Sequence, residues 1–207
     1  MTITLGILAS GRGSNFKAIA DNIKKNRIDA KIEILITDNP SAGVLHIANM
    51  YGIKAICIEK TEGMKRDEHE SIIDAELRKY EVELIVLAGY MRILTPSFIE
   101  KWRWRIINTH PSLLPAFGGK GMYGMNVHRA VIESGTKYSG CTVHFVTENT
   151  DMGQIIAQNV IKVKDNDTVD SLEKRILKKE HELLPKVIDL IGKGKVTINN
   201  NRVHIEK

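Results

Sequence analysis

The sequence predicts an α/β fold with a mostly parallel central sheet and helices on both of its faces. Short apolar runs rich in Ile, Leu and Val alternate with longer segments of helical periodicity through the first half of the chain. Two runs, residues 3–9 and 84–88, are apolar at nearly every position, as expected of strands buried on both faces. From residue 138 onward two strand-like segments follow one another, which predicts antiparallel strand additions toward the C-terminal half.

Composition favours a single domain that spans residues 1–207. With 43% hydrophobic and 27% charged residues, the chain is long enough to bury a well-packed core. The formal net charge is +5, and the basic residues are interspersed with acidic ones. This pattern indicates solvated helix faces, and it favours a small anionic ligand over nucleic acid as a partner.

Cysteine usage and the N-terminus bear on the cellular compartment. Cys57 and Cys141 lie outside any C-x-x-C pair, which favours a reducing environment. The chain opens without a charged leader, and no apolar run reaches about 18 residues. We therefore expect a cytoplasmic protein with no membrane partner, as a monomer or a homodimer. His69-Glu70 begins the zinc motif H-E-x-x-H, but Ile73 replaces the second histidine, so no metal site is expected.

The first half contains four expected strands and four expected helices. The strands are at residues 3–9, 32–37, 54–58 and 84–88, and the helices at 16–23, 42–51, 64–80 and 96–102. Asp38 follows the second strand, near the position of the ribose-binding acid in nicotinamide enzymes. Because the glycine fingerprint of those enzymes is incomplete here, we interpret Asp38 as a turn residue.

A glycine loop joins the first strand to the first helix at residues 10–15. Ser14 or Asn15 can cap the helix, and the free N–H groups at its start can hold a phosphate. An ordinary strand-to-helix turn is the alternative, because the loop lacks the third glycine of G-x-G-x-x-G.

A polar pair stands at the end of the strand expected at residues 105–110. Strand side chains alternate between faces, so Asn108 and His110 share one face. Pro111 then favours an extended backbone for His110 and the start of a loop. Ligands bind at the carboxyl ends of strands in open α/β sheets, so this pair is a candidate site. Residues 118–124 contain four glycines and are predicted to form a lid or substrate-binding loop.

The second half completes a Rossmann-like arrangement with strands added to it. A helix is expected at residues 125–134, strands at 138–146 and 155–163, a long helix at 167–192 and an exposed hairpin at 196–205. Asp151, between the two strands, is the one acid of its loop flanked by apolar or small residues, and a turn role is the alternative. Glu180 falls on the inward stripe of the long helix and must meet a partner. Pro185 is expected to kink or divide that helix.

Together, several motifs resemble those of the phosphoribosylglycinamide formyltransferases. They are residues 11–15 (G-R-G-S-N), 88–94 (A-G-Y-M-R-I-L), 108–115 (N-T-H-P-S-L-L-P), 143–146 (V-H-F-V) with Asp151, and 180–181 (E-H). The resemblance runs nearly end to end. The motifs N-x-H-P-S-L-L-P and M-R-I-L are typical of the wider group of 10-formyl-tetrahydrofolate transferases and hydrolases. The motifs G-S-N and E-H point to the glycinamide ribonucleotide branch.

The resemblance implies formyl transfer from the co-substrate 10-formyl-tetrahydrofolate to the amine of glycinamide ribonucleotide, a step of purine biosynthesis. It implies substrate binding by Gly13, Ser14, Asn15 and Glu180, the first three at the phosphate. It implies folate binding by Arg66, Met91, Arg92, Ile93, Leu94, Thr147 and Asp151. The catalytic residues of the family correspond to Asn108, His110 and Asp151. On this interpretation residues 1–100 are the phosphate- and ribonucleotide-binding half, and residues 101–207 are the folate-binding and catalytic half.

The implied chemistry is a direct attack of the amine on the formyl carbon. Asn108 and a protonated His110 would stabilise the resulting oxyanion, and Asp151 would favour the imidazolium and move the proton. No metal and no covalent intermediate is needed. Leu177 departs from the family, which often has Lys or Gln there, and Gln154 stands where Pro is common.

Two other enzymatic functions are compatible with these motifs: formyl-tetrahydrofolate hydrolysis, and formyl transfer to another amine. Hydrolases of the group usually have an extra N-terminal domain and transfer-RNA formyltransferases an extra C-terminal one, and 207 residues are expected to hold neither. A nucleotide-binding module without catalysis would explain the glycine loop. It would leave Asn108, His110 and Asp151 unexplained.

Overall fold

The computed structural model describes residues 2–206 and contains every element expected from the sequence, with ends that differ by one or two residues. The chain folds into two compact units, one ending at Ile107 and the other starting at Asn108. Seven strands form a sheet in the order β3-β2-β1-β4-β5-β6-β7, and β5 (Ile106–His110) contains the boundary between the units. The order confirms the predicted α/β class.

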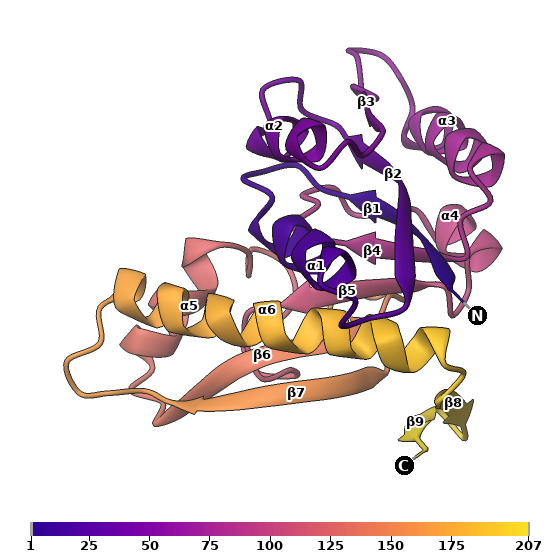
Figure 1. The fold of residues 1–207 in the computed structure, drawn as a ribbon. Coiled ribbons are helices and arrows are strands. Elements are labelled where there is room, and N and C mark those ends of the chain that lie inside the picture. The colour runs from indigo at the N-terminus through magenta and orange to yellow at the C-terminus, as the bar shows by residue number, and fades with distance from the viewer. Residues whose placement is uncertain (1, 207) are drawn as a thin grey trace. The chain divides into compact units, whose positions relative to one another are not determined.

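The first unit is a parallel α/β arrangement. Its strands are β1 (Ile3–Leu8), β2 (Ala30–Thr37), β3 (Ala55–Cys57) and β4 (Leu84–Leu87), and its helices are α1 (Ser14–Lys24), α2 (Gly43–Met50), α3 (Arg66–Lys79) and α4 (Pro96–Lys101). β1 pairs in parallel with both β2 and β4, and β2 pairs in parallel with β3. Helices α1 and α3 flank these strands on opposite faces (Figure 1). The carboxyl ends of these strands therefore share one edge, where ligand-binding loops are expected.

Packing in the first unit follows from the continuous apolar strands. Leu5, Ile7 and Leu8 of β1 are completely buried. A Cβ atom at Gly6 would overlap the side chain of Leu77, so the missing side chain lets α3 lie directly against β1.

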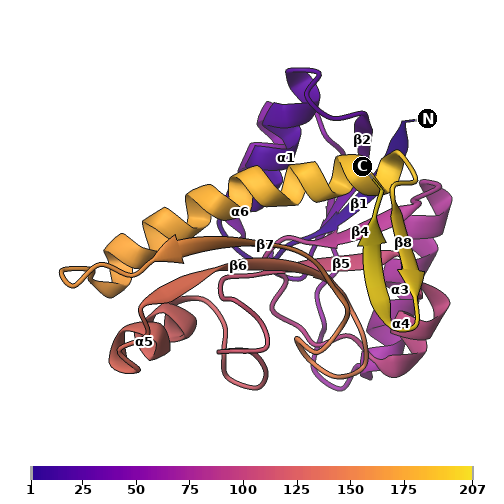
Figure 2. The ribbon, with the colours of Figure 1, turned by 90° about the horizontal axis from the view of Figure 1, so that it is seen from below.

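The second unit is built around an antiparallel pair. β6 (Tyr138–Phe145) and β7 (Ile155–Lys162) pair antiparallel, and α5 (Met125–Glu133) precedes them. The long helix α6 (Val169–Gly192) runs along both strands (Figure 2). A separate hairpin of β8 (Val196–Asn199) and β9 (Arg202–Ile205) follows it. The predicted antiparallel additions and the exposed hairpin are both confirmed.

At two positions the structure corrects a local expectation. The N-cap of α1 is Gly13, with φ +82°, so neither Ser14 nor Asn15 caps the helix. A Cβ atom at Gly13 would overlap Val44, so close packing against α2 requires glycine here. Pro185 does not divide α6, which is one helix through this residue. Pro185 is buried, as are Leu184 and Val187 on the inward face of the helix. Proline lacks the N–H for one backbone hydrogen bond, and this packing stabilises the helical turn without that bond.

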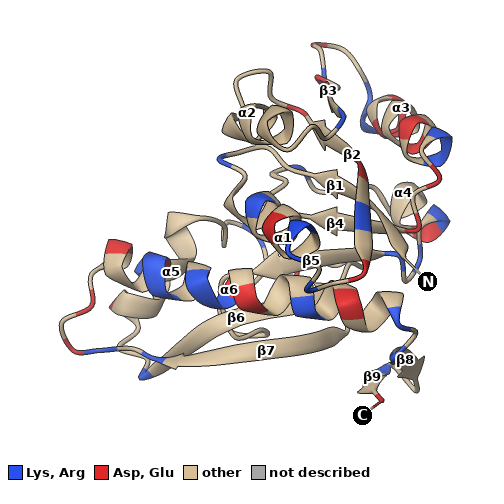
Figure 3. Ribbon diagram, in the orientation of Figure 1, with Lys and Arg blue, Asp and Glu red and all other residues tan. Residues whose placement is uncertain are grey.

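Charge on the helices follows the sequence pattern. Basic and acidic residues are interspersed along α6, as Figure 3 shows, with the pair Lys179–Glu182 at 2.7 Å and, at the end of the helix, Lys193–Asp189 at 2.6 Å. Within residues 2–206 no helix is long and apolar enough to cross a membrane.

Candidate active site

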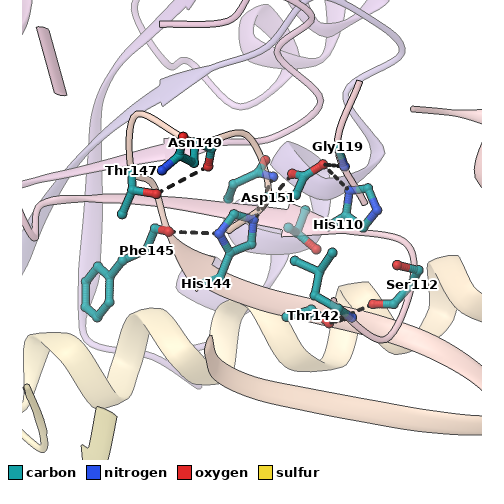
Figure 4. Close-up of polar contacts among 12 residues, drawn as sticks. His110, Ser112, Gly119, Thr142, His144, Phe145, Thr147, Asn149 and Asp151 are labelled. Carbon is teal, nitrogen blue, oxygen red and sulfur yellow. Dashed lines mark hydrogen bonds and ion pairs between the residues drawn. The ribbon is translucent and has the colours of Figure 1, made fainter. Parts of the chain in front are cut away.

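The end of β5, the end of β6 and the loop between β6 and β7 bring together four polar side chains of the second unit. They are Asn108, His110, His144 and Asp151, and Figure 4 shows the carboxylate of Asp151 between the two imidazoles. His110 and His144 are buried, and the side chain of Asp151 is 10% exposed. The three residues proposed as catalytic from the sequence are thus neighbours, although Asp151 is distant in the chain.

His110 has an acceptor at each ring nitrogen. Nε2 lies 2.8 Å from the carbonyl oxygen of Phe117, which can only accept, so Nε2 carries a hydrogen. Nδ1 lies 3.5 Å from Asp151 Oδ2. The imidazolium form of His110 is therefore the one that donates at both nitrogens. The longer contact, at Nδ1, is the one that can be exchanged for a contact with a substrate.

His144 is a member of this cluster that the sequence reasoning did not select. Its Nδ1 lies 2.8 Å from the carbonyl oxygen of Phe145, so Nδ1 carries the hydrogen of the neutral ring. Nε2 then accepts from the side-chain amide of Asn108 at 3.2 Å, and it lies 3.7 Å from Asp151 Oδ1. Burial lowers the pKa of His144, which favours this neutral form. The only signal in the sequence was its place in the V-H-F-V motif.

A backbone N–H of the glycine-rich segment holds the carboxylate of Asp151 in place. The N–H of Gly119 donates to Asp151 Oδ2 at 2.9 Å, which connects the glycine-rich segment at 118–124 to the site. Asp151 itself has φ +57°, a left-handed conformation that Asp and Asn tolerate better than most residues. In the same loop the hydroxyl of Thr147 donates to the carbonyl oxygen of Asn149 at 3.3 Å (Figure 4). Gln154 lies after this loop, and its side-chain oxygen is buried without a hydrogen-bond partner among residues 2–206.

Glu180 lies on the buried face of α6, as its place on the apolar stripe predicted. Thr109 of β5 donates its hydroxyl to Glu180 Oε1 at 3.1 Å, so a hydrogen-bond donor meets the carboxylate. Because Thr109 alternates with Asn108 and His110 along β5, Glu180 contacts the opposite face of that strand. Leu177, on the preceding turn of α6, is half-buried.

The glycine loop in the first unit has the features of an anion site. The first N–H groups of a helix have no intrahelical acceptor, and α1 begins directly after Gly13. The side-chain oxygen of Asn15 is buried and finds no hydrogen-bond partner within residues 2–206; as an acceptor it suits a donor group of a ligand, such as a hydroxyl, and not the anion itself. Ser14 and Asn15 thus bring both backbone and side-chain groups to the start of this helix.

A cavity of about 360 Å³ lies in the first unit beside the segment between β4 and α4. Its lining residues are Lys60, Arg66, His69, Glu70, Met91, Arg92 and Ile93. Four residues predicted to bind folate are among them: Arg66, Met91, Arg92 and Ile93. Leu94 is not, because its side chain is 4% exposed and belongs to the core. His69 and Glu70 have structural partners, the carbonyl oxygen of Ile58 and the N–H of Thr95.

The fold and these sites define an α/β protein in which two buried imidazoles lie beside a carboxylate and a half-buried amide, a cluster equipped for acid-base chemistry and for stabilising an oxyanion. No group of three or more His, Cys, Asp or Glu side chains in residues 2–206 is arranged to hold a metal ion. The model of the formyl transferase family matches residues 4–188, and the chain belongs to this family. The resemblance inferred from the motifs is therefore confirmed.

Relatives with known names agree with this assignment. The chain is 41% identical over 187 residues to phosphoribosylglycinamide formyltransferase of Bacillus subtilis, covering 90% of this chain and 93% of that protein. It is 39% identical over 196 residues to the chloroplastic phosphoribosylglycinamide formyltransferase of Arabidopsis thaliana, covering 93% of this chain and 66% of that protein. It is 38% identical over 197 residues to the human trifunctional purine biosynthetic protein adenosine-3, covering 95% of this chain and 19% of that protein. The chain thus spans less than two thirds of the plant and human relatives.

Solved structures give the same fold. Glycinamide ribonucleotide transformylase 1 from Symbiobacterium toebii has a TM-score of 0.94 and 37% identity, covering 100% of this chain and 95% of that one. A formyltetrahydrofolate deformylase from Pseudomonas syringae has a TM-score of 0.89 at 20% identity, covering 100% of this chain and 67% of that one. At that identity the likeness shows the fold alone.

Proposed function

We propose that this protein transfers the formyl group of 10-formyl-tetrahydrofolate to the amine of glycinamide ribonucleotide in purine biosynthesis. The observation that carries the proposal is the cluster of His110, Asp151 and the half-buried Asn108, which contacts His144, in a chain of the formyl transferase family. Membership of the family supplies the formyl folate as co-substrate. The similarity to the phosphoribosylglycinamide formyltransferase of Bacillus subtilis, over nearly the whole of both chains, supports the ribonucleotide as acceptor.

The cluster would catalyse the transfer as follows. The neutral amine nitrogen attacks the formyl carbon, and the carbonyl oxygen becomes an oxyanion to which the free hydrogen of the Asn108 amide and Nδ1 of His110 donate. The bond from the formyl carbon to the folate nitrogen then breaks. Asp151, directly or through water, transfers the proton of the attacking nitrogen to the leaving folate nitrogen. Atoms and charges balance without a covalent enzyme intermediate.

The binding residues follow the same proposal. Gly13, Ser14 and Asn15 would hold the substrate phosphate, and Glu180 would meet the amine end or the ribose. The folate would contact Arg66, Met91, Arg92, Ile93, Leu94, Thr147 and Asp151. The cavity beside Arg66 and Met91 supports this folate set, whereas the burial of Leu94 limits that residue to its backbone. Residues 1–100 would be the phosphate- and ribonucleotide-binding half of one domain, and residues 101–207 the folate-binding and catalytic half.

The proposal extends to the state and location of the protein. We expect a monomer or a homodimer in the cytoplasm, with no nucleic-acid or membrane partner. The free thiols of Cys57 and Cys141 suit a reducing compartment.

An absorbance assay of folate product, with and without glycinamide ribonucleotide, tests the proposal. Formation of tetrahydrofolate that depends on the ribonucleotide is expected. Equal release without any amine would instead indicate a hydrolase, and dependence on a different amine would indicate another formyltransferase. Absence of turnover with every acceptor would contradict an enzymatic role.

Asp151→Asn tests the role of the carboxylate within the same assay. The left-handed backbone at Asp151 accommodates Asn, and the amide oxygen can still accept from Gly119, so the loop should keep its shape. We expect kcat to fall by on the order of 100-fold or more because the proton acceptor is lost. Binding of both substrates, measured by calorimetry, should stay within about threefold of the unchanged protein. Near-normal turnover would remove Asp151 from the mechanism.

A further inference from the structure

The segment from Met91 to Thr95 has no regular secondary structure, yet side chains from other elements hold almost every residue of it. The N–H of Met91 donates to the hydroxyl of Ser10 at 3.0 Å. The carbonyl oxygen of Ile93 accepts from the guanidinium of Arg66. The N–H of Thr95 donates to the carboxylate of Glu70 at 3.0 Å. Side chains of Ser10, Arg66 and Glu70 thus fix the backbone of this segment.

Two apolar side chains of this segment, those of Met91 and Ile93, point away from the core, whereas that of Leu94 is buried in it. Met91 is 54% exposed and Ile93 is 57% exposed, and both line the cavity described above. Exposed apolar side chains on a fixed backbone are suited to a flat organic ligand. The shape of the backbone then determines how well such a ligand fits.

Asp38 makes two of the contacts that hold the segment. Its Oδ1 accepts from the hydroxyl of Ser10 at 2.5 Å, and its Oδ2 pairs with Nε of Arg92 at 2.7 Å. Since the single hydroxyl hydrogen of Ser10 is directed to Asp38, the lone pairs of that oxygen are left for the N–H of Met91. One carboxylate therefore orients the acceptor for residue 91 and the side chain of residue 92. The Asp38 side chain is only 10% exposed, which limits the screening of these contacts by water.

The turn that contains Asp38 does not need this carboxylate. The N–H of Asn39 donates to the hydroxyl of Thr37 at 3.2 Å, and the N–H of Ser41 donates to the side-chain oxygen of Asn39 at 3.0 Å. The interpretation of Asp38 as a turn residue accounts for its position, but the partners of its side chain lie at Ser10 and Arg92.

We propose that Asp38 is a positioning residue for folate binding, which acts through Ser10 and Arg92 on the backbone of residues 91–94. This inference rests on the proposed function, because it takes the folate as the flat ligand of this segment. Asp38 itself need not touch the ligand. Its carboxylate keeps the segment in the one conformation that the ligand recognises.

Two variants separate the two contacts. Asp38→Asn can still accept from Ser10, but an amide hydrogen would oppose Arg92, so the contact to Arg92 is lost. Ser10→Ala removes the contact to Met91 and leaves the ion pair with Arg92. Glu33→Gln is the matched control, because Glu33 forms a surface ion pair with Lys31 on the same strand β2.

Steady-state kinetics with both substrates and thermal unfolding form the test. We expect Asp38→Asn to raise KM for 10-formyl-tetrahydrofolate about tenfold, the effect of losing one partly buried ion pair that holds the segment. KM for glycinamide ribonucleotide and kcat should stay within about twofold, and Tm should change by less than about 3 °C. Ser10→Ala should raise the same KM. The double variant Ser10→Ala with Asp38→Ala should raise it by less than the product of the effects of Ser10→Ala and Asp38→Ala, each measured alone. Glu33→Gln should behave as the unchanged protein.

Other outcomes overturn the inference. A lower Tm with an unchanged KM for the folate would make Asp38 a purely structural residue. An equal rise in both KM values would indicate general distortion of the unit. Failure of the proposed function is distinguishable, because it would appear in the unchanged protein as absent transfer to the ribonucleotide, and the inference would fall with it.

Discussion

The neutral tautomer of His144 determines what Asn108 can do. Nδ1 of His144 faces a carbonyl oxygen, so Nε2 is left as an acceptor for one hydrogen of the Asn108 amide. The amide cannot rotate without bringing its oxygen against Nε2, and its second hydrogen therefore has a fixed direction. In the proposed mechanism that second hydrogen meets the oxyanion.

Replacing His144 should accordingly lower the rate of the chemical step. We expect His144→Leu to reduce kcat about tenfold, equivalent to roughly 1.4 kcal/mol, through a loosely held Asn108. His144→Gln should recover part of this loss, because its side-chain oxygen can accept from the same amide. The measurement is kcat for formyl transfer under saturating substrates.

His204→Gln serves as control, since His204 is exposed on β9 and its replacement removes a histidine far along the chain from the site. If His144→Leu kept full turnover, or if Gln restored nothing although the protein folded, positioning of Asn108 by His144 would be excluded.

At the scale of elements, the loop between β6 and β7 depends on a single glycine. A Cβ atom at Gly153 would overlap the carbonyl oxygen of Phe145. The N–H of Phe145 donates to the carbonyl oxygen of Gln154 at 2.9 Å, so the two backbones are tied at this point. Asp151 lies two residues before Gly153, so a shift of the backbone at residue 153 would also move Asp151.

Gly153→Ala should therefore affect both stability and turnover. Overpacking of this kind costs roughly 1–3 kcal/mol, and we expect a lower Tm together with at least about a tenfold loss of kcat. Gly43→Ala is the matched control, because a Cβ there meets its neighbours at 3.6 Å, an ordinary contact distance. Thermal unfolding and kcat together provide the measurement, and an unchanged kcat would show that the loop adapts without moving Asp151.

The elements themselves were predictable because their signals are local. Apolar runs and helical stripes gave each strand and helix to within one or two residues, and alternation along β5 placed Asn108 beside His110. The cap of α1 was not predictable, because Gly13 is required by close contact with Val44, a residue distant in the sequence. The continuity of α6 was not predictable either, because it depends on the burial of Pro185 in the core. His144, which lies in the cluster, and Asp38, for which we propose a positioning role, were not selected for the same reason: their partners are remote in sequence. Asp151 was found only through the family resemblance.

At the scale of the whole molecule, two buried histidines couple stability to pH. Burial lowers the pKa of His144 and of His128, a residue of α5, below the ordinary value of 6.5. The unfolded chain therefore takes up protons at these positions at a higher pH than the folded protein does. Above about pH 6.5 both histidines are neutral in the folded and in the unfolded state, and they do not lower the free energy of unfolding. As the pH falls below about 6.5, the unfolded state is protonated first, and the free energy of unfolding decreases.

We expect the free energy of unfolding to decrease from pH 7 toward pH 5.5, with each histidine contributing at most about 1.4 kcal/mol per pH unit. The measurement is chemical unfolding across that range for the unchanged protein and for His128→Asn, comparing slopes against pH because the substitution itself can alter stability at every pH. His128→Asn should flatten the curve, since Asn does not titrate. His204→Gln should leave the slope unchanged, because that histidine is exposed. Parallel curves for all three proteins would show that His128 keeps its ordinary pKa in the folded state, and the acid sensitivity would then have to come from other groups.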